Sequence, residues 1–167
     1  MHNELTQKDL ELMRQELDHR RLVLMPQQLE AVKVARGFGD LSENFEYKAA
    51  KQELNRNKGR IRFLENMIKT AVVVDVAGPA DGVQLYDRVT VYLPEDSEEE
   101  VYQIVTTVRQ DALHGLISLE SPVGKALLGR KVGDTVHIQV NESYGYDMVI
   151  RAIEKGSDDG SVPLNQY

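Results

Sequence analysis

Two runs of apolar residues with alternating spacings of three and four dominate the first 75 residues of this chain of 167 residues. One position of the repeat is filled by Leu10, Leu17, Leu24 and Ala31 in the first run, and by Tyr47, Leu54, Ile61 and Ile68 in the second. This spacing is typical of helices that pack along a seam as a coiled coil. Residues 36–40 separate the runs and contain two glycines, which can end a helix and let the chain reverse. The sequence therefore predicts a hairpin of two long antiparallel helices over residues 1–77.

Two residues of this expected hairpin, Pro26 and Asn57, are unusual in a coiled coil. The second seam position of the first run is occupied by Met13, Arg20, Gln27 and Val34. Pro26 interrupts this run, and because proline lacks a backbone N–H we expect it to kink or loosen the first arm. In the second run Asn57 occupies a seam position, and pairing centred on Leu41 would place it opposite Met25 or Pro26, near Gln27. A buried polar residue at such a position commonly fixes the register of paired helices, so we expect that role for Asn57.

Beyond residue 75 the apolar pattern changes to a period of two, which is typical of β-strands. The expected strands cover residues 85–92, 101–106, 116–119, 135–140 and 146–150. Residues 121–128 fit a short helix, with Ser121 as its N-cap and Pro122 in its first turn. These elements predict a compact α+β domain with an antiparallel sheet over residues 78–156. The segment 157–167 is expected to form a flexible tail.

Charge is divided unevenly between these two parts. The formal net charge is −7, which argues against a protein that holds nucleic acid mainly through its phosphates. Residues 1–75 carry 13 Lys/Arg against 12 Asp/Glu, whereas residues 76–167 carry 7 against 15.

With no cysteine, the chain has no disulfide, thiolate metal site or cysteine nucleophile. It also lacks the roughly 20 consecutive apolar residues of a membrane span and a signal-peptide core, so a cytoplasmic location is expected.

Three carboxylates lie close together where the second helix is expected to begin: Asp40, Glu43 and Glu46. Their spacing permits two interpretations. Asp40 as N-cap with Glu43 three residues later would form a capping box, which only stabilises the helix. Alternatively, the pair offers oxygen ligands at the end of a long rod, and one or two carboxylates plus water are what Mg²⁺ usually takes from a protein. Two such residues cannot make a tight metal site alone, so a second molecule would have to complete it.

Several short motifs occur together in the two parts of the chain. In the hairpin they are residues 40–44 (Asp-Leu-Ser-Glu-Asn), 46–47 (Glu-Tyr), 49–51 (Ala-Ala-Lys), 59–61 (Gly-Arg-Ile) and 64–65 (Leu-Glu). In the second domain they are residues 98–100 (Glu-Glu-Glu), 102–105 (Tyr-Gln-Ile-Val), 117–118 (Ile-Ser) and 121–129, which begins Ser-Pro-Val-Gly-Lys. Together these motifs resemble those of the bacterial Gre transcript-cleavage factors, and the tip motif and the Ser-Pro motif are specific when they occur together.

The resemblance implies an accessory factor rather than an enzyme, with a coiled-coil hairpin followed by an FKBP-like domain. In this family the FKBP-like domain docks at the rim of the secondary channel of RNA polymerase, and the hairpin enters the channel. Its acidic tip helps to hold the second catalytic Mg²⁺ and to orient the attacking water, and the polymerase then cuts the displaced 3′ end of backtracked RNA. Asp40 and Glu43 match the family's acidic pair and inherit both roles, which agree with two-metal hydrolysis of a phosphodiester. The factor is expected to be a monomer with no stably bound cofactor, sharing only the Mg²⁺ of the polymerase.

Six basic residues follow the tip along the second helix, with Glu53 as the single acid between them: Lys48, Lys51, Arg56, Lys58, Arg60 and Arg62. They form either a solvated helix face or a stripe that holds the backbone of the displaced RNA. Ser121 and Pro122 are the best candidates for the polymerase-docking surface. The chain also departs from the family pattern. Phe45 replaces the usual Ala after the tip Asn, residues 25–27 read Met-Pro-Gln instead of Arg-Pro-Glu, and the C-terminal tail is longer.

Two other functions are alternatives. A non-cleaving regulator that occupies the same channel would carry an altered tip, and the intact Asp40 and Glu43 argue against it. An FKBP-like domain can instead be a prolyl isomerase, which uses an apolar aromatic pocket. All three phenylalanines lie in the hairpin segment and the chain has no tryptophan, so only tyrosines could line such a pocket. Cleavage of RNA in backtracked complexes distinguishes these functions.

Overall fold

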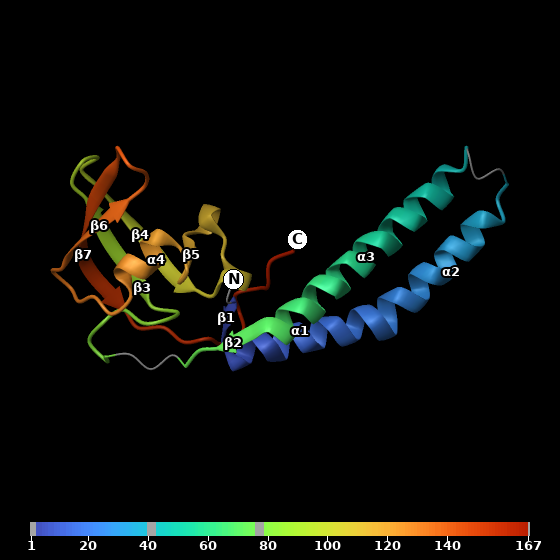
Figure 1. The fold of residues 1–167 in the computed structure, drawn as a ribbon, viewed down its shortest axis with the longest axis horizontal. Helices are drawn as coiled ribbons and strands as arrows, with labels where there is room; N and C mark the ends of the chain where they lie inside the picture. Colours follow the sequence, from blue (N-terminus) through green and yellow to red (C-terminus); the bar gives the residue numbers. More distant parts are fainter. Residues whose placement is uncertain (1–2, 40–42, 76–78, 167) are drawn as a thin grey trace. The chain divides into compact units, whose positions relative to one another are not determined.

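The computed structural model describes residues 3–39, 43–75 and 79–166, and these residues form two compact units. One unit contains Leu10–Ala71 and is helical; we call it the hairpin unit. The other combines the N-terminal residues up to Asp9 with Val72–Gln166 and is built around a sheet; we call it the sheet unit. The α+β class with an N-terminal helical hairpin is therefore confirmed (Figure 1).

The hairpin unit has two antiparallel arms (Figure 1). The first arm comprises α1 (Gln7–His19), the π-helical turn η1 (Arg20–Leu24) and α2 (Met25–Arg36), and the second arm is the single helix α3 (Phe45–Thr70). Buried apolar side chains from both arms line the seam: Leu10, Met13, Leu17, Val32 and Ala35 from the first arm, and Leu54, Ile61, Leu64 and Met67 from the second. After α2, Gly39 has a φ of +126°, a conformation that favours glycine. None of the helices in the described ranges is long and apolar enough to cross a membrane.

The buried positions of the first arm are displaced by one residue in its second half. The apolar repeat predicts Ala31 and Val34 in the seam, but both are exposed, and Val32 and Ala35 are buried instead. Before the displacement, Leu17 is buried at its predicted seam position. A shift of one residue requires one additional residue in the helix between these two parts.

The turn η1 accommodates this additional residue. In η1 the N–H of Met25 donates to the carbonyl of Arg20, five residues earlier, whereas a regular α-helix bonds residues four apart. Pro26, the second residue of α2, has no N–H to donate to the preceding turn. The expected loosening of the first arm near Pro26 is confirmed, and it takes the form of a π-helical turn.

Asn57 is buried in the seam, as expected, but it bonds to Arg20 and not to Met25 or Pro26. Its Oδ1 accepts from Nη1 of Arg20 at 3.0 Å, and its Nδ2 donates to the carbonyl oxygen of Arg20 at 3.2 Å. The midpoint of this pair lies between residues 38 and 39, so the predicted centre of pairing at Leu41 is wrong. Asn57 bonds to the same carbonyl that closes the π-helical turn, which ties the second arm to the irregular part of the first.

The sheet unit contains a five-stranded sheet in the order β5-β4-β3-β7-β6 (Figure 1). Its strands are β3 (Arg88–Leu93), β4 (Glu98–Val105), β5 (Leu116–Ser118), β6 (Thr135–Gln139) and β7 (Gly145–Glu154). Neighbouring strands are antiparallel except β4 and β5, which are parallel, so the prediction of an antiparallel sheet is wrong for this pair. Two 3-10 turns, η2 (Thr107–Arg109) and η3 (Ala112–His114), lie in the connection between them.

One face of this sheet carries the core of the sheet unit. Val89 and Val91 of β3 and Ile104 of β4 are fully buried there, and they cluster with Leu127 of the short helix α4 (Pro122–Leu127). Residues between them on β3 are more exposed, which is the predicted period of two. A second sheet, which was not expected from the sequence, pairs the short strands β1 (Asn3–Leu5) and β2 (Ala71–Val73).

Candidate functional site

The acidic tip lies between the two arms of the hairpin unit. Asp40 falls outside the described residues, whereas Glu43 is exposed just before α3. The N-cap of α3 is Asn44: its Oδ1 accepts from the N–H of Tyr47 at 3.0 Å, and its Nδ2 donates to the carbonyl of Ala35 at 2.6 Å. The capping-box interpretation of Asp40 and Glu43 is therefore wrong, because a different residue caps the helix.

The carboxylates of the tip have a chemistry that suits a metal ion. Glu43 precedes the cap and Glu46 lies in the first turn of α3, and both side chains are exposed. Negative side chains are favourable near a helix N-terminus, where peptide N–H groups point outward. Within the described residues, no three Asp, Glu, His or Cys side chains gather to hold a metal ion. Carboxylate oxygens are the ligands Mg²⁺ prefers, so the donor type fits a Mg²⁺ whose other ligands come from a second molecule.

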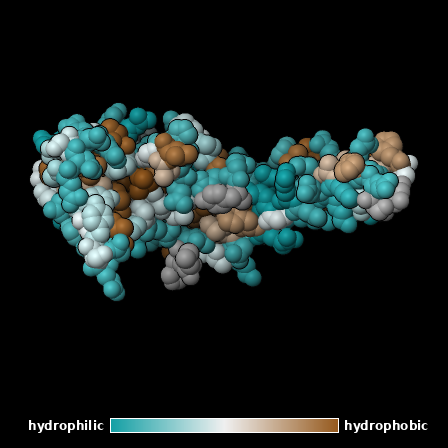
Figure 2. Space-filling view, turned by 90° about the horizontal axis from the view of Figure 1, so that it is seen from above, coloured by the Kyte–Doolittle hydropathy of each residue, from teal (hydrophilic) through white to brown (hydrophobic). Residues whose placement is uncertain are grey.

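Two phenylalanines are exposed beside the tip. Phe38 is 66% exposed and Phe45 is 80% exposed. Figure 2 shows hydrophobic side chains at this end of a hairpin whose visible surface is otherwise largely hydrophilic. Nζ of Lys48 lies 5.7 Å from the centre of the Phe45 ring, within range of a cation–π attraction. Phe45 therefore places a large apolar ring two residues after Glu43.

Tyr47 lies between two cations contributed by the two arms. The guanidinium of Arg36 is 5.5 Å from the centre of the Tyr47 ring, and Nζ of Lys51 is 5.6 Å from it. Nζ of Lys51 also donates to the Tyr47 hydroxyl at 3.3 Å. Hydrogen bonds from Arg36 and then Lys51 lower the pKa of the Tyr47 hydroxyl below its usual value. The start of α3 is therefore a cluster of basic and aromatic groups.

The predicted basic stripe is exposed along α3 at five of its six positions: Lys48, Lys51, Arg56, Lys58 and Arg62. Arg60 is only 8% exposed, and its Nε and Nη2 donate to the carboxylate of Glu16 at 2.8 and 3.2 Å. Partial burial opposes ionisation of Glu16, but the hydrogen bonds and charges of Arg60 and Arg20 hold its pKa below the usual value. Arg60 therefore joins the two arms, and the exposed stripe is corrected to its five other members.

The predicted docking motif lies at the start of α4. Oγ of Ser121 accepts from the N–H of Gly124 at 3.0 Å and donates to the carbonyl of Ser118 at 2.7 Å, so Ser121 is the N-cap, as predicted. A Cβ on Gly124 would lie 2.1 Å from that carbonyl oxygen, so only glycine fits this position. Pro122 is exposed. Of the two predicted residues, Ser121 fixes the turn and Pro122 is exposed to solvent.

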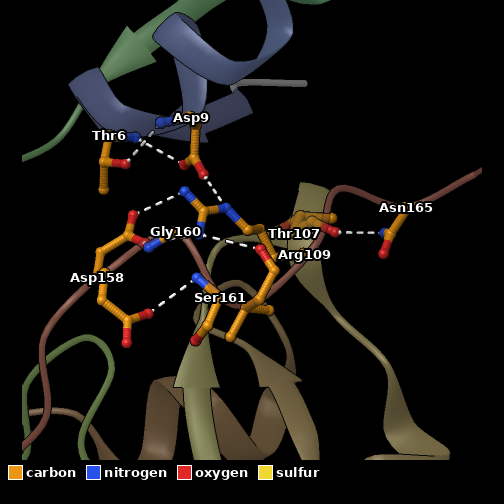
Figure 3. Close-up of polar contacts among 10 residues, drawn as sticks. Thr6, Asp9, Thr107, Arg109, Asp158, Gly160, Ser161 and Asn165 are labelled. Atoms are coloured by element: carbon orange, nitrogen blue, oxygen red, sulfur yellow. Dashed lines mark hydrogen bonds and ion pairs between the residues drawn. The ribbon is translucent and has the colours of Figure 1, made fainter. Parts of the chain in front are cut away.

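A buried cluster of charged groups in the sheet unit was not anticipated from the sequence (Figure 3). Arg109 of η2 is fully buried, and its Nε donates to Oδ1 of Asp9 at 2.7 Å. Its Nη1 and Nη2 donate to the two carboxylate oxygens of Asp158, each at 2.7 Å. Asp9 also forms a capping box with Thr6 at the start of α1, with bonds of 2.9 and 3.1 Å. Arg109 therefore joins N-terminal, central and C-terminal parts of the sheet unit.

The C-terminal segment expected to be a flexible tail makes further contacts beside this cluster (Figure 3). Nη1 of Arg109 donates to the carbonyl of Val162 at 3.3 Å. The backbone N–H of Asn165 donates to the carbonyl of Val108 at 2.7 Å, and its Nδ2 donates to the carbonyl of Thr107 at 3.0 Å. The described part of the segment is thus docked on the sheet unit.

The capping box at the start of α1 has a local signal in the sequence, the Thr-x-x-Asp spacing of residues 6–9. No local pattern predicts the contact of Asp9 with Arg109.

Comparison with known proteins assigns the chain to a family. Residues 3–73 match the family model "Transcription elongation factor, N-terminal", and residues 78–155 match "Transcription elongation factor, GreA/GreB, C-term". Transcription elongation factor GreA of Geobacillus kaustophilus is 43% identical over 151 residues, which cover 89% of this chain and 93% of that protein. GreA of Lactococcus lactis subsp. lactis is 45% identical over 135 residues, covering 80% and 86%. A crystal structure of GreA factor homolog 1 of Thermus thermophilus covers 93% of this chain and 100% of that one at 27% identity, with a TM-score of 0.44. On the matches to both family models, this chain belongs to the GreA/GreB family of transcription elongation factors.

Proposed function

We propose that this protein binds RNA polymerase and stimulates the polymerase's own cleavage of the 3′ end of backtracked RNA, so that arrested transcription resumes. The observation that carries the proposal is the match of the two family models over residues 3–73 and 78–155. The tip also supports the proposal. Because Asn44 caps α3, the carboxylate of Glu43 is not required for capping and can serve as a metal ligand. The protein is an accessory factor, since the reaction takes place in the active site of the polymerase.

In this proposal Asp40 and Glu43 act at the tip of the hairpin unit. Their carboxylates provide oxygen ligands to a Mg²⁺ that the polymerase also holds, and they orient the water that attacks the RNA. When bound, this Mg²⁺ supplies positive charge to the phosphate and to the attacking water. The exposure of Glu43 ahead of the helix N-terminus supports the assignment, because an acceptor there can meet a second molecule.

The five exposed basic residues of α3 then bind the backbone of the displaced RNA. A positively charged surface with aromatic side chains suits single-stranded nucleic acid, because phosphates meet the cations and bases can stack on the rings. The cluster of Arg36, Tyr47 and Lys51 gives this end of the hairpin unit both kinds of group.

The finer assignments follow from the family resemblance and are part of the same proposal. The sheet unit is FKBP-like and docks at the rim of the secondary channel of RNA polymerase through the surface around Pro122. The hairpin unit enters the channel. The protein acts as a monomer in the cytoplasm and binds no cofactor of its own beyond the shared Mg²⁺.

Cleavage of RNA in stalled elongation complexes tests the role of the tip. We expect Asp40→Asn to reduce stimulated cleavage by about 100-fold or more, because losing one metal ligand removes several kcal/mol of transition-state stabilisation. Binding to polymerase should change by less than about twofold. Glu30→Gln is the control, since it removes an exposed carboxylate of α2 outside the tip and should cleave like the wild type.

The same assay separates the alternatives. Near wild-type cleavage by Asp40→Asn would refute the tip assignment. A wild-type protein that binds polymerase without stimulating cleavage would be a non-cleaving regulator. Isomerisation of a proline peptide without polymerase binding would instead identify a prolyl isomerase.

A further inference from the structure

The sheet unit contains a cavity of about 220 Å³ that none of the roles above uses. It lies where the β3–β4 turn and the β6–β7 turn meet, and Figure 1 shows both turns at the same end of the sheet. Leu93 and three tyrosines, Tyr102, Tyr144 and Tyr146, are among its lining residues. The rings of Tyr144 and Tyr146 are 6.1 Å apart and inclined at 31°. The cavity therefore has aromatic walls and an apolar residue beside them.

The remaining lining residues are all carboxylates. They are Glu95 and Asp96 of the β3–β4 turn, Glu100 of β4 and Asp147 of β7, and no Lys or Arg of the described residues lines the cavity. Asp147 already has a partner, because its Oδ1 lies 2.7 Å from Nδ1 of His137. Glu95, Asp96 and Glu100 are exposed. The cavity is thus strongly negative.

The tyrosine hydroxyls reinforce this arrangement. The hydroxyl of Tyr144 donates to Oε2 of Glu95 at 3.1 Å, and that of Tyr102 donates to Glu100. The hydrogen bond to Glu95 raises the pKa of Tyr144, and burial followed by the hydrogen bond to Glu100 raises that of Tyr102. The hydroxyls therefore stay protonated and hold the carboxylates in place. The face of an aromatic ring carries the negative part of its quadrupole, so the tyrosine rings and the carboxylates both attract a cation.

We propose that this cavity receives a cationic side chain, Arg or Lys, of a partner protein. The walls favour a side chain, because its methylene groups can contact Leu93 and the tyrosine rings while its charged end meets Asp96 and Glu100. An anionic group such as a phosphate would be repelled. A small metal ion would need at least three ligating side chains close enough together to hold it, and no such group occurs among the described residues, those of the cavity included.

The partner we assign is RNA polymerase, and this part of the inference rests on the proposed function. The sheet unit is the acidic part of the chain, with 15 Asp/Glu against 7 Lys/Arg over residues 76–167, so it attracts a basic surface over a distance. In addition to the docking surface around Pro122, the cavity makes a specific contact with one basic side chain of the polymerase.

A titration of the full-length protein tests the cavity without polymerase. The probes are N-acetyl-arginine amide, N-acetyl-lysine amide and, as a neutral shape-matched control, N-acetyl-citrulline amide. We expect the cationic probes to shift the NMR signals of Tyr102, Tyr144 and Tyr146, and the citrulline probe to leave them unchanged. Equal shifts from all three probes, or none from the cationic ones, would overturn the proposal.

A pair of double variants adds the partner to the test. Asp96→Asn with Glu100→Gln removes two charges from the cavity, and Glu99→Gln with Glu142→Gln removes two exposed charges outside its lining. We expect the first variant to bind both cationic probes and polymerase about tenfold more weakly, as for a lost charge-assisted hydrogen bond. The second should stay within about twofold of the wild type.

The outcomes distinguish this inference from the proposed function. If the wild type and both variants bind polymerase equally, the cavity is not a contact and the proposed function stands. If the wild type does not bind polymerase at all, the proposed function fails, and the assignment of the partner fails with it. If both variants bind polymerase equally more weakly than the wild type, the effect is one of general charge, and the assignment of the cavity as a binding site is also overturned.

Discussion

The hairpin unit and the sheet unit are stabilised in different ways. In the sheet unit, fully buried side chains such as Val89, Ile104 and Ile150 belong to one continuous cluster. In the hairpin unit, the buried apolar side chains form a single seam, and polar pairs such as Glu16 with Arg60 lie along it. A close-packed core transmits the effect of one substitution to many neighbours, whereas a seam responds locally. The hairpin unit therefore depends on individual pairs along one seam, and the sheet unit on shared burial together with the buried ion pairs of Arg109.

The largest effect is expected in the sheet unit, at its buried ion pairs. Arg109→Met should lower the free energy of unfolding by about 3–5 kcal/mol, because it leaves the carboxylates of Asp9 and Asp158 without their cation. Guanidinium unfolding of the full chain, followed by tyrosine fluorescence, measures the change. Lys131→Met is the control, since its ion pair with Asp81 is exposed to solvent and should contribute little to stability. Similar losses in both variants would mean that burial does not distinguish the two ion pairs.

An intermediate effect is expected at Glu16 in the seam of the hairpin unit. Because its pKa is lowered in the folded state, Glu16 stabilises the fold above its ordinary pKa of 4.5, and this stabilisation is lost as the pH falls through the folded-state pKa. We expect Glu16→Gln to cost about 1 kcal/mol at neutral pH and to reduce the loss of stability on acidification. Urea unfolding followed by circular dichroism, at neutral pH and well below pH 4.5, measures both.

The control for this experiment is Glu53→Gln. The carboxylate of Glu53 lies 2.7 Å from Nη1 of Arg56, and both side chains of this ion pair are exposed. The variant should unfold like the wild type at both pH values, because exposed ion pairs contribute little. An acid sensitivity that is unchanged in Glu16→Gln would show that the seam does not depend on this pair.

The smallest effect on stability is expected at the tip. Phe45→Ala should change the free energy of unfolding by no more than about 0.5 kcal/mol, because the ring is 80% exposed and Ala is a good helix former. Stimulated cleavage should increase, since removing the ring leaves more room beside Glu43. Thermal unfolding and the cleavage assay measure the two quantities. Phe38→Ala removes an exposed ring from the other arm and should leave cleavage unchanged; a destabilisation above about 1 kcal/mol in Phe45→Ala would mean that the ring packs.

The elements that sequence could predict are those set by local pattern. The helical hairpin follows from its apolar spacing, and the Ser121 cap follows from the Ser-Pro start of α4. The displaced seam could not be predicted, because both possible pairs are apolar: Ala31 and Val34, or Val32 and Ala35. Only the hydrogen bond of the π-helical turn decides between them.

Contacts between residues far apart in the sequence are the second kind of feature that could not be predicted. Arg109 and Asp158 are 49 residues apart and lie in segments without a shared pattern, so their ion pair is a consequence of the fold. Arg60 is a different case. It lies three residues after Asn57 and four before Leu64, so it shares a helix face with two seam residues. Its position beside the seam was available from the sequence, and only its partner Glu16 was not.

The π-helical turn gives the first arm a tolerance for insertions and deletions. In a regular helix, one inserted residue rotates everything beyond it by about 100°, which would turn the far half of the arm away from α3. Here η1 (Arg20–Leu24) absorbs the rotation, so Val32 and Ala35 face α3 despite the additional residue. Deleting one residue from Arg20–Leu24 would therefore restore regular α-helical hydrogen bonding in this turn and keep Val32 and Ala35 facing α3.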